Sequence, residues 1–460
     1  MDPQSSHRPP EPPAPSVLSK EGSQPGIRDT PLIASGKAYD EIKERLHAKL
    51  VATVKPEEVA KLSEEERRRE IRSVAERLIE TECPLANLKQ RNQLLQDLLD
   101  EVLGLGPLEK LLRDPSISDI LVNGPYEVWI ERRGQLEETP IRFRDTSHLL
   151  EIIYRIVSRV GRRVDESSPM VDARLPDGSR VNAIVPPVSL RGPALSIRRF
   201  GTNPLHMKDL IHLKSLSPQM AQLLEGVVKA RLNVVISGGT GSGKTTLLNA
   251  LSSFIPANER IITIEDAAEL QLQQRHVVQL EARPPNVEGK GEITTRDLVR
   301  NALRMRPNRI IVGECRGAEV LDMLQAMNTG HEGSMSTLHA NSPRDALARL
   351  ELMMLLSGID IPVKAMRQQI ASALNVIVQI DRLPGGPRRV TSISEIVGME
   401  QDVVIAQEIF IFRQLGIDHH GKAFGQFEAT GVRPKFMERL AAASIELPPH
   451  LFHEGVQLRA

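Results

Sequence analysis

Cysteine is scarce in this chain of 460 residues, which carries only Cys83 and Cys315. Two cysteines without a paired spacing exclude a disulfide framework and a cysteine-based zinc site, and the histidines form no cluster that would replace the missing ligands. A reducing compartment suits this composition. We therefore expect no stoichiometric zinc.

Long hydrophobic runs are missing as well. No run approaches the roughly 20 apolar residues that a transmembrane helix needs, and the N-terminus has no apolar signal core. The sequence therefore predicts a cytoplasmic protein whose contact with a membrane is peripheral.

An excess of charge of one sign is the third absence. Lys plus Arg and Asp plus Glu both number 59, so the chain lacks the overall basic field of most nucleic-acid-binding proteins. This balance argues against a nucleic-acid partner without excluding a local basic patch.

Hydrophobic residues make up 40% and charged residues 26% of the chain, which is typical of folded domains. A chain of this length exceeds one hydrophobic core and should divide into two or three domains. Residues 1–35 are rich in Pro, Ser and Gly and are predicted to form a disordered tail. Residues 36–103 have a helical pattern, in which Ser63 and Glu66 form a capping box that opens a helix through Ile79.

The next region, residues 104–200, mixes short β-like runs with a helix. The runs at 120–124, 126–130 and 181–185 are predicted strands, and 149–160 is a predicted helix. This pattern indicates a small α/β domain.

A linker at residues 201–206, which contains Gly and Pro, is predicted to act as a hinge before residues 207–460. Beyond it, strand-like runs alternate with helices to about residue 380, which predicts a parallel sheet with helices on its faces. Residues 388–460 should add one strand, 389–397, and a short helical tail as a C-terminal extension.

A glycine-rich loop is the strongest chemical signal. It follows the apolar run 232–236 and precedes a helical segment, which is the strand, loop and helix setting of a P-loop. Glycines let the loop aim backbone N–H groups at phosphates, Lys244 would neutralise the β- and γ-phosphates, and the Thr245 hydroxyl would hold Mg²⁺. The sequence therefore predicts ATP and Mg²⁺ as ligands. The expected nucleotide-binding residues are Gly238, Gly239, Thr240, Gly241, Ser242, Gly243, Lys244, Thr245 and Thr246.

Further strand-like runs end in residues that are capable of chemistry. Open α/β sheets bind ligands at the carboxyl ends of their strands, so these residues should meet beside the P-loop. Glu314 is placed to polarise the attacking water, and Glu265 and Asp266 would hold Mg²⁺ through water. His339 and His331 are candidates for contacting the phosphates, although an isolated histidine is more often an ordinary polar residue.

Two segments around these residues, 301–314 and 330–341, closely resemble the Walker B and histidine-box segments of the bacterial secretion ATPase superfamily. Residues 165–183 and 195–200 resemble the CpaF family of tight-adherence pilus motors within it. The likeness covers roughly residues 36–455. Relatives that drive type II secretion and type IVa pilus extension usually carry a four-cysteine zinc module, and nothing like it is present in this sequence, which separates the chain from them.

The resemblance implies a RecA-like P-loop ATPase domain, a smaller N-terminal α/β domain of PAS-like type and a helical N-terminal extension. It implies a homohexamer that holds ATP between the two domains and pushes on inner-membrane platform proteins, peripheral at the cytoplasmic face of that membrane. Its work would be to assemble, or to assemble and retract, a type IVc (Flp-like) pilus. It makes Glu265 and Asp266 an aspartate box and His339 a phosphate-proximal histidine. The candidate arginines for closing onto the γ-phosphate are Arg174, Arg180, Arg198 and Arg199.

Three other readings stay open. A conjugation-type secretion ATPase would export protein or DNA instead of building a pilus. A nucleic-acid translocase on the same core would show salt-sensitive stimulation by DNA or RNA. A regulatory module that binds nucleotide without hydrolysis would show no steady-state turnover, and Glu314 argues against it. Cys315 stands where an apolar residue is expected, and we expect it to pack rather than to react.

Overall fold

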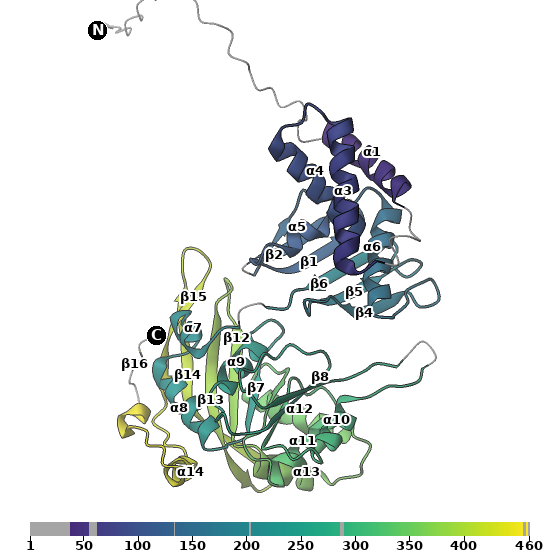
Figure 1. Cartoon of the computed structure of the whole chain (residues 1–460). Coiled ribbons are helices and arrows are strands. Elements are labelled where there is room, and N and C mark those ends of the chain that lie inside the picture. The colour runs from purple at the N-terminus through teal and green to yellow at the C-terminus, as the bar shows by residue number, and fades with distance from the viewer. Residues whose placement is uncertain are drawn as a thin grey trace, which may run out of the picture. The chain divides into compact units, whose positions relative to one another are not determined.

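The computed structural model describes residues 37–54, 62–132, 134–201, 204–285, 289–453 and 457–458. Two compact units divide the chain, residues 1–109 and 110–460 (Figure 1). The predicted tail, residues 1–35, lies outside the described residues, as do Thr202 and Asn203 of the predicted hinge. Among the helices that are described, none combines the length and the apolar character that crossing a bilayer demands.

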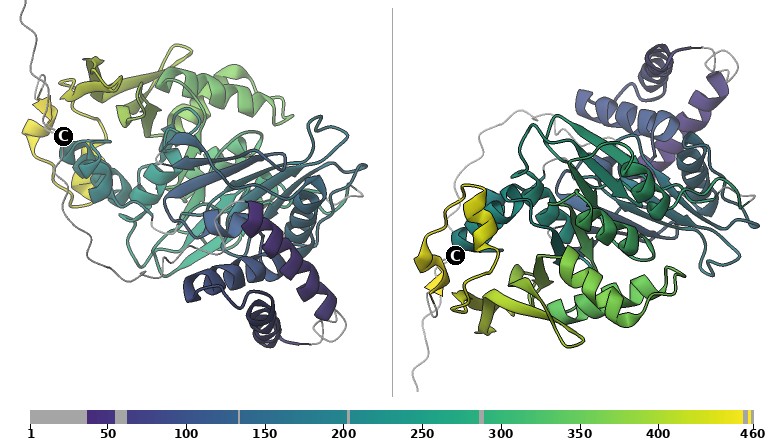
Figure 2. Two further views of the ribbon diagram at one scale, coloured as in Figure 1. Left: turned by 90° about the horizontal axis from the view of Figure 1, so that it is seen from above. Right: turned by 90° about the horizontal axis from the view of Figure 1, so that it is seen from below.

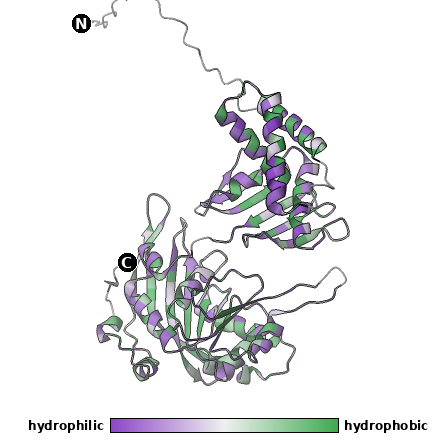
Figure 3. Cartoon of the chain, in the orientation of Figure 1, coloured by the Kyte–Doolittle hydropathy of each residue, from purple (hydrophilic) through white to green (hydrophobic). Residues whose placement is uncertain are grey.

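Three helices dominate the first unit: α1 (Lys37–Thr53), α3 (Glu64–Glu82) and α4 (Leu88–Leu103). The predicted capping box is confirmed, because the Ser63 side chain accepts the N–H of Glu66 while the Glu66 carboxylate accepts the N–H of Ser63. The helix ends at Glu82 and not at the predicted Ile79. Much of α3 is hydrophilic (Figure 3), and its apolar stripe packs into a core shared by the three helices. That core includes Leu46, Leu50, Ile71, Ala75, Leu94 and Leu98.

After α5 (Leu108–Leu112), the second unit opens with an antiparallel sheet of six strands in the order β3-β2-β1-β6-β5-β4. The strands are β1 (Ile117–Asn123), β2 (Val128–Arg132), β3 (Gln135–Glu138), β4 (Met170–Arg174), β5 (Arg180–Ile184) and β6 (Ala194–Arg198). Helix α6 (Thr146–Arg159) contacts β4, and Asp145 caps it by accepting the N–H of His148. A sheet and a helix are therefore present where the small α/β domain is predicted; that residues 104–200 form a domain of their own, and that this domain is PAS-like, stay predictions.

The second sheet has ten strands in the order β16-β15-β14-β13-β12-β7-β11-β10-β8-β9. From β12 to β9 all neighbours are parallel. These strands are β7 (Val234–Ser237), β8 (Ile261–Glu265), β9 (Val277–Glu281), β10 (Arg309–Val312), β11 (Met335–Leu338) and β12 (Val376–Arg382). The predicted parallel sheet is confirmed.

Helices cover both faces of the parallel strands, and side chains alternate between two cores. Val234 and Ile236 of β7 pack toward one core, whereas Val235 packs into the other. The first core takes its helical residues from α7 (Met207–His212), α8 (Pro218–Lys229) and α9 (Lys244–Ser252). The second takes them from α10 (Thr295–Ala302), α11 (Glu319–Asn328), α12 (Pro343–Leu355) and α13 (Val363–Ala373). Because helices cover the faces of the sheet, ligands are expected at the carboxyl ends of the parallel strands.

The C-terminal region differs from the prediction of one strand and a helical tail. It forms an antiparallel meander, whose strands are β13 (Arg388–Glu400), β14 (Val403–Ile417), β15 (Ala423–Ala429) and β16 (Gln457–Leu458). Each of the long strands β14 and β15 exposes part of its length, so polar residues interrupt the apolar run that marks a buried strand. Between β15 and β16 lie α14 (Met437–Ala442) and the short helix η1 (Pro449–Phe452). Figure 2 shows the yellow C-terminal helices beside the teal α8, where Leu440 abuts Gly226.

The amino edge of the parallel sheet contains a buried ion pair. Arg309 is fully buried, and its Nε and Nη2 donate to the two carboxylate oxygens of Glu259 at 2.6 and 2.9 Å. Its Nη1 donates to the Val228 carbonyl at 2.8 Å. A Cβ on Gly333 would lie 2.7 Å from that same Nη1, so only glycine fits there.

Replacing Arg309 by Ala should destabilise the second unit by about 3–5 kcal/mol, because Glu259 would remain buried without its partner. The melting temperature should fall by roughly 4–7 °C in a unit of this size. Lys229→Ala removes an exposed i,i+4 pair with Glu225 and should cost less than about 1 kcal/mol. Equal melting temperatures for the two variants would contradict the stabilising role of the buried pair between Arg309 and Glu259.

Candidate functional site

The glycine-rich loop joins the fully buried strand β7 to helix α9. Gly241 and Gly243 have φ angles of 68° and 102°, which favour glycine. A Cβ on Gly238 would collide with the Ile380 carbonyl oxygen and lie 2.6 Å from the Ser242 hydroxyl oxygen. The loop therefore has the tight curvature that turns backbone N–H groups toward an anion at the start of α9.

Lys244 lies within this loop. Its side-chain Nζ donates to the carbonyls of Gly238 and Gly239 at 3.1 and 2.9 Å. Burial is the main cause that lowers the pKa of the Lys244 ammonium from its usual value. An ammonium that is desolvated and donates to neutral carbonyl oxygens gains strongly from a phosphate partner.

Three strand ends meet beside Lys244, as the sequence predicts. Glu314 follows β10 and His339 follows β11, and the Nε2 of His339 lies 2.8 Å from Glu314 Oε1 and 3.4 Å from Lys244 Nζ. Burial, followed by the charge of Lys244, lowers the pKa of His339 from its usual value. The arrangement places a carboxylate, an imidazole and an ammonium in one row.

Glu265 ends β8 and is buried. Its Oε1 accepts the N–H groups of Glu269 and Leu270 at 2.9 and 3.0 Å, whereas Oε2 is buried and accepts no hydrogen bond from the described part of the chain. Burial is the main cause that raises the pKa of Glu265 to about 7. Its neighbour Asp266 accepts the Thr295 hydroxyl at 2.7 Å.

The carboxylates suit Mg²⁺ held mainly by water and phosphate. No group of three or more His, Cys, Asp or Glu side chains able to hold a metal occurs among the described residues. Mg²⁺ typically keeps several waters and takes one or two carboxylates, and the Glu265 Oε2, which accepts no hydrogen bond from the described residues, and the neighbouring Asp266 would be the carboxylates to hold it. Thr245, at the start of α9, would supply the hydroxyl of the P-loop.

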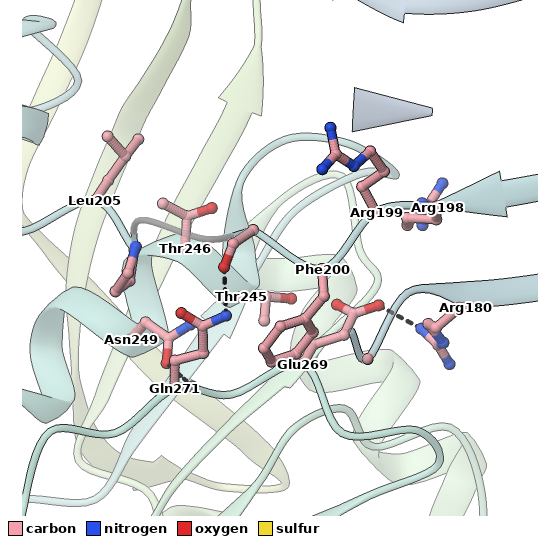
Figure 4. Close-up of a pocket in the computed structure, with 13 residues that line it drawn as sticks. Arg180, Arg198, Arg199, Phe200, Leu205, Thr245, Thr246, Asn249, Glu269 and Gln271 are labelled. Carbon is pink, nitrogen blue, oxygen red and sulfur yellow. Dashed lines mark hydrogen bonds and ion pairs between the residues drawn. The ribbon is translucent and has the colours of Figure 1, made fainter. Parts of the chain in front are cut away.

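A pocket next to the P-loop contains three of the four predicted arginines. Figure 4 shows side chains that converge on it from α9, from the end of β6 and from the segment after β8. Its lining includes Arg180, Arg198, Arg199, Phe200, Leu205, Thr245, Thr246, Asn249, Glu269 and Gln271. Arg174 is absent from this lining and lies in a wider neighbouring cleft that also contains Asp266 and Arg316.

Each predicted arginine has a partner within the chain. Arg180 pairs with Glu269. Arg174 lies 2.8 Å from Glu281, and Arg198 lies 3.1 Å from Asp119. The Nη1 of Arg199 donates to the backbone carbonyl of Asp114. A phosphate that recruits these arginines must therefore compete with groups that already hold them.

His331 does not belong to this site, contrary to the hypothesis that it contacts the phosphates. It precedes β11, whereas His339 follows that strand, so His331 lies at the amino edge of the parallel sheet. Its carbonyl accepts the Ser334 hydroxyl at 2.7 Å, and burial lowers the pKa of its ring.

Cys315 and Arg316 directly follow Glu314 in the chain. Cys315 is buried, and its Sγ lies 3.4 Å from the Met323 sulfur and 3.1 Å from the Ser336 hydroxyl, so the predicted packing role is confirmed. Arg316, which the sequence reasoning missed, places Nε and Nη2 at 2.9 and 2.6 Å from Glu314 Oε2. The signal for it was the spacing, since residues i and i+2 of an extended segment project to the same side.

Replacing Gly238 by Ala should lower the melting temperature, because the added methyl group collides with the backbone at Ile380. Gly239→Ala is the matched control, since nothing lies within 4 Å of a Cβ at that position. The expected cost at Gly238 is about 1–3 kcal/mol. Thermal melting of both variants without nucleotide checks this; an equal shift in the two would contradict the packing argument.

Comparison with known proteins agrees with this site. Residues 101–409 match the model of a family described as type II/IV secretion system protein. The chain is 42% identical over 306 residues to a putative conjugal transfer protein of Mycobacterium tuberculosis, covering 65% of this chain and 86% of that protein. It is 32% identical over 304 residues to the type IV secretion system protein VirB11 of Brucella suis, covering 60% and 84%.

Among solved structures, the pilus retraction motor PilT with bound ADP is similar at 21% identity and a TM-score of 0.48, covering 64% of this chain and 83% of that one. The family match spans well over half of the chain and includes the P-loop, Glu314 and His339. The chain belongs to the type II/IV secretion system protein family.

Proposed function

We propose that the chain is the ATP-driven motor of a tight-adherence pilus of the type IVc (Flp-like) class, or of a closely related secretion machine. The observation that carries the enzymatic part is the row formed by Lys244, His339 and Glu314 beside the glycine-rich loop. The likeness of residues 165–183 and 195–200 to the CpaF family supports the pilus class.

In the binding step, the loop N–H groups and Lys244 take the β- and γ-phosphates. Lys244 exchanges its contacts with the Gly238 and Gly239 carbonyls for phosphate oxygens, which is favourable because an ionised acceptor is the stronger partner. Phe200 and Leu205 provide an apolar wall for the nucleoside in the adjoining pocket. Thr245, Glu265 and Asp266 would hold Mg²⁺, which neutralises charge on the phosphates.

In the hydrolytic step, Glu314 orients the attacking water. Its Oε1 is buried and lies on the side of His339 and Lys244, with the Nε2 of His339 2.8 Å away. Phosphoryl transfer gains most from positioning and charge stabilisation, so a fixed acceptor facing the phosphates is what the reaction needs. His339, in contact with this oxygen, would sense the γ-phosphate.

The arginines in and next to the antiparallel sheet would neutralise the remaining negative charge of the phosphates. Arg180, Arg198 and Arg199 line the pocket that contains Thr245 and Thr246 of the same chain. Arg174 lies in the neighbouring cleft and would have to move farther. We propose a hinge near residues 201–206 as the means of this movement.

We base the proposed oligomeric assembly on the resemblance to the secretion ATPase superfamily. We propose a homohexamer at the cytoplasmic face of the inner membrane, which transmits domain closure to the platform proteins of the pilus machine. A conjugation-type secretion ATPase is the second candidate, because the relatives of Mycobacterium tuberculosis and Brucella suis carry conjugal transfer and type IV secretion names. A nucleic-acid translocase is the weaker alternative, since the chain has no net charge.

Replacing Glu314 by Gln should lower kcat by roughly 100- to 10,000-fold, because the amide orients and polarises water poorly. ATP affinity should change little, since Glu314 holds no phosphate. Lys244→Ala should instead abolish binding. Turnover by steady-state phosphate release and binding of a fluorescent nucleotide separate the two effects; wild-type turnover by Glu314→Gln would refute the catalytic assignment.

The arginines should act on the nucleotide of their own chain. Mixed hexamers of Lys244→Ala and Arg180→Ala subunits should therefore show no recovery of ATPase activity. Exchange of labelled subunits verifies that mixed rings form. Recovery of a substantial fraction of wild-type hydrolysis would mean that Arg180 serves a neighbouring subunit.

A further inference from the structure

The two oxygens of the Glu314 carboxylate have different surroundings. Oε1 is buried and faces His339, on the side of Lys244. Oε2 receives both Nε and Nη2 of Arg316, at 2.9 and 2.6 Å. A carboxylate oxygen accepts about two hydrogen bonds, so Arg316 fills Oε2, whereas Oε1, beside His339 Nε2 at 2.8 Å, keeps the capacity for one further hydrogen bond from water.

Arg316 is itself held in place by its backbone. The N–H groups of Arg316 and Gly317 both donate to Oε1 of Glu319, at 2.6 and 2.8 Å. Glu319 is buried at the start of α11, so the turn that carries Arg316 is tied to a packed helix. The guanidinium also lies 3.5 Å from Asp266, whose other oxygen accepts the Thr295 hydroxyl.

The Glu314 carboxylate needs such a holder because a competing cation is near. The Lys244 ammonium lies 3.4 Å from the same His339 nitrogen that contacts Glu314. A carboxylate without Arg316 would be drawn toward this desolvated ammonium, and it would then occupy the space of the water and the phosphate.

We propose that Arg316 is the positioning residue of the Glu314 carboxylate: it anchors Oε2 from behind, so that Oε1 faces the P-loop and orients the attacking water. This inference rests on the proposed function, in which Glu314 orients water. Arg316 acts through Glu314 and contacts neither the nucleotide nor the reacting water.

The test compares Arg316→Ala, Arg316→Lys and Arg413→Ala in the full-length protein. Arg413 is the matched control, since its side chain is 60% exposed and pairs with Glu428 at 2.9 Å, as Arg316 is 60% exposed beside Glu314. Arg316→Ala should lower kcat roughly 100-fold, with KM and the affinity for a non-hydrolysable ATP analogue changed less than about 3-fold. Arg316→Lys should recover part of kcat, because a point charge restores attraction without the two-nitrogen contact. Arg413→Ala should leave kcat unchanged.

The same substitution in the Glu314→Gln background distinguishes positioning from a direct role. Single-turnover rates should fall less than about 2-fold when Arg316→Ala is added to Glu314→Gln, because the pair acts as one unit. An equal fall in both backgrounds, or a parallel loss of analogue binding, would show that Arg316 contacts the nucleotide and would overturn the inference.

Two further results separate this inference from the proposed function. Wild-type turnover by Arg316→Ala beside an inactive Glu314→Gln overturns only the role of Arg316. Wild-type turnover by Glu314→Gln overturns both. If Arg316→Ala melts early, the kcat and KM of Arg316→Lys and Arg316→Gln replace it in the comparison, since both retain part of the aliphatic stem.

Discussion

The parallel pairing of β12, β7, β11, β10, β8 and β9 is the constraint on which the site depends. Parallel strands deliver their carboxyl ends to one edge, so residues far apart in sequence meet there. Strand β11 lies between the P-loop strand β7 and the strand β10 that leads to Glu314. His339 at the end of β11 must therefore stand between Lys244 and Glu314, which explains its distances of 3.4 and 2.8 Å to their side chains.

At the amino ends of the parallel strands, buried polar side chains are hydrogen-bonded to groups of the chain itself. Arg309 and Glu259 fill one part of it. Asn233 fills another, where its amide donates to the Ala373 carbonyl at 2.6 Å and accepts the N–H of Gly333 at 2.8 Å. Buried polar groups with complete partners rigidify a fold but offer nothing to a ligand. The groups that can serve a ligand lie at the carboxyl edge, where Glu265 Oε2 accepts no hydrogen bond from the described residues and Glu314 Oε1 faces His339.

Sequence reasoning succeeded where a local pattern or a general rule of sheets decides the outcome. The P-loop is a contiguous motif, and the convergence of Glu265, Glu314 and His339 follows from strand direction alone. His331 was misplaced because the histidine-containing motif includes residues before and after strand β11, while only the residues after its carboxyl end reach the site. Strands β14 and β15 escaped notice because polar residues on their exposed stretches break the apolar runs that mark buried strands.

The partners of the arginines were out of reach for a different reason. Glu269 lies far from Arg180 in the chain, and Glu281 lies far from Arg174, so only the tertiary fold brings each pair together. Arg316 is adjacent in sequence, yet its direction depends on the buried Glu319 carboxylate that fixes its backbone.

The arginines of the site fall into two groups according to the carboxylates that they contact. Arg180 and Arg174 are each held by a carboxylate of the same unit, so a nucleotide recruits them only by exchange of one anion for another. Such an exchange costs little, because charge pairing is kept while the group moves. Arg316 and Glu314, in contrast, lie on one turn after a single strand, and their contact does not require the antiparallel sheet to move. Under the proposed function, the carboxylate that orients water is thus prepared by the parallel sheet alone, whereas the charge that stabilises the phosphates would arrive with movement. Hydrolysis would then wait for the movement, which is the coupling that a motor requires.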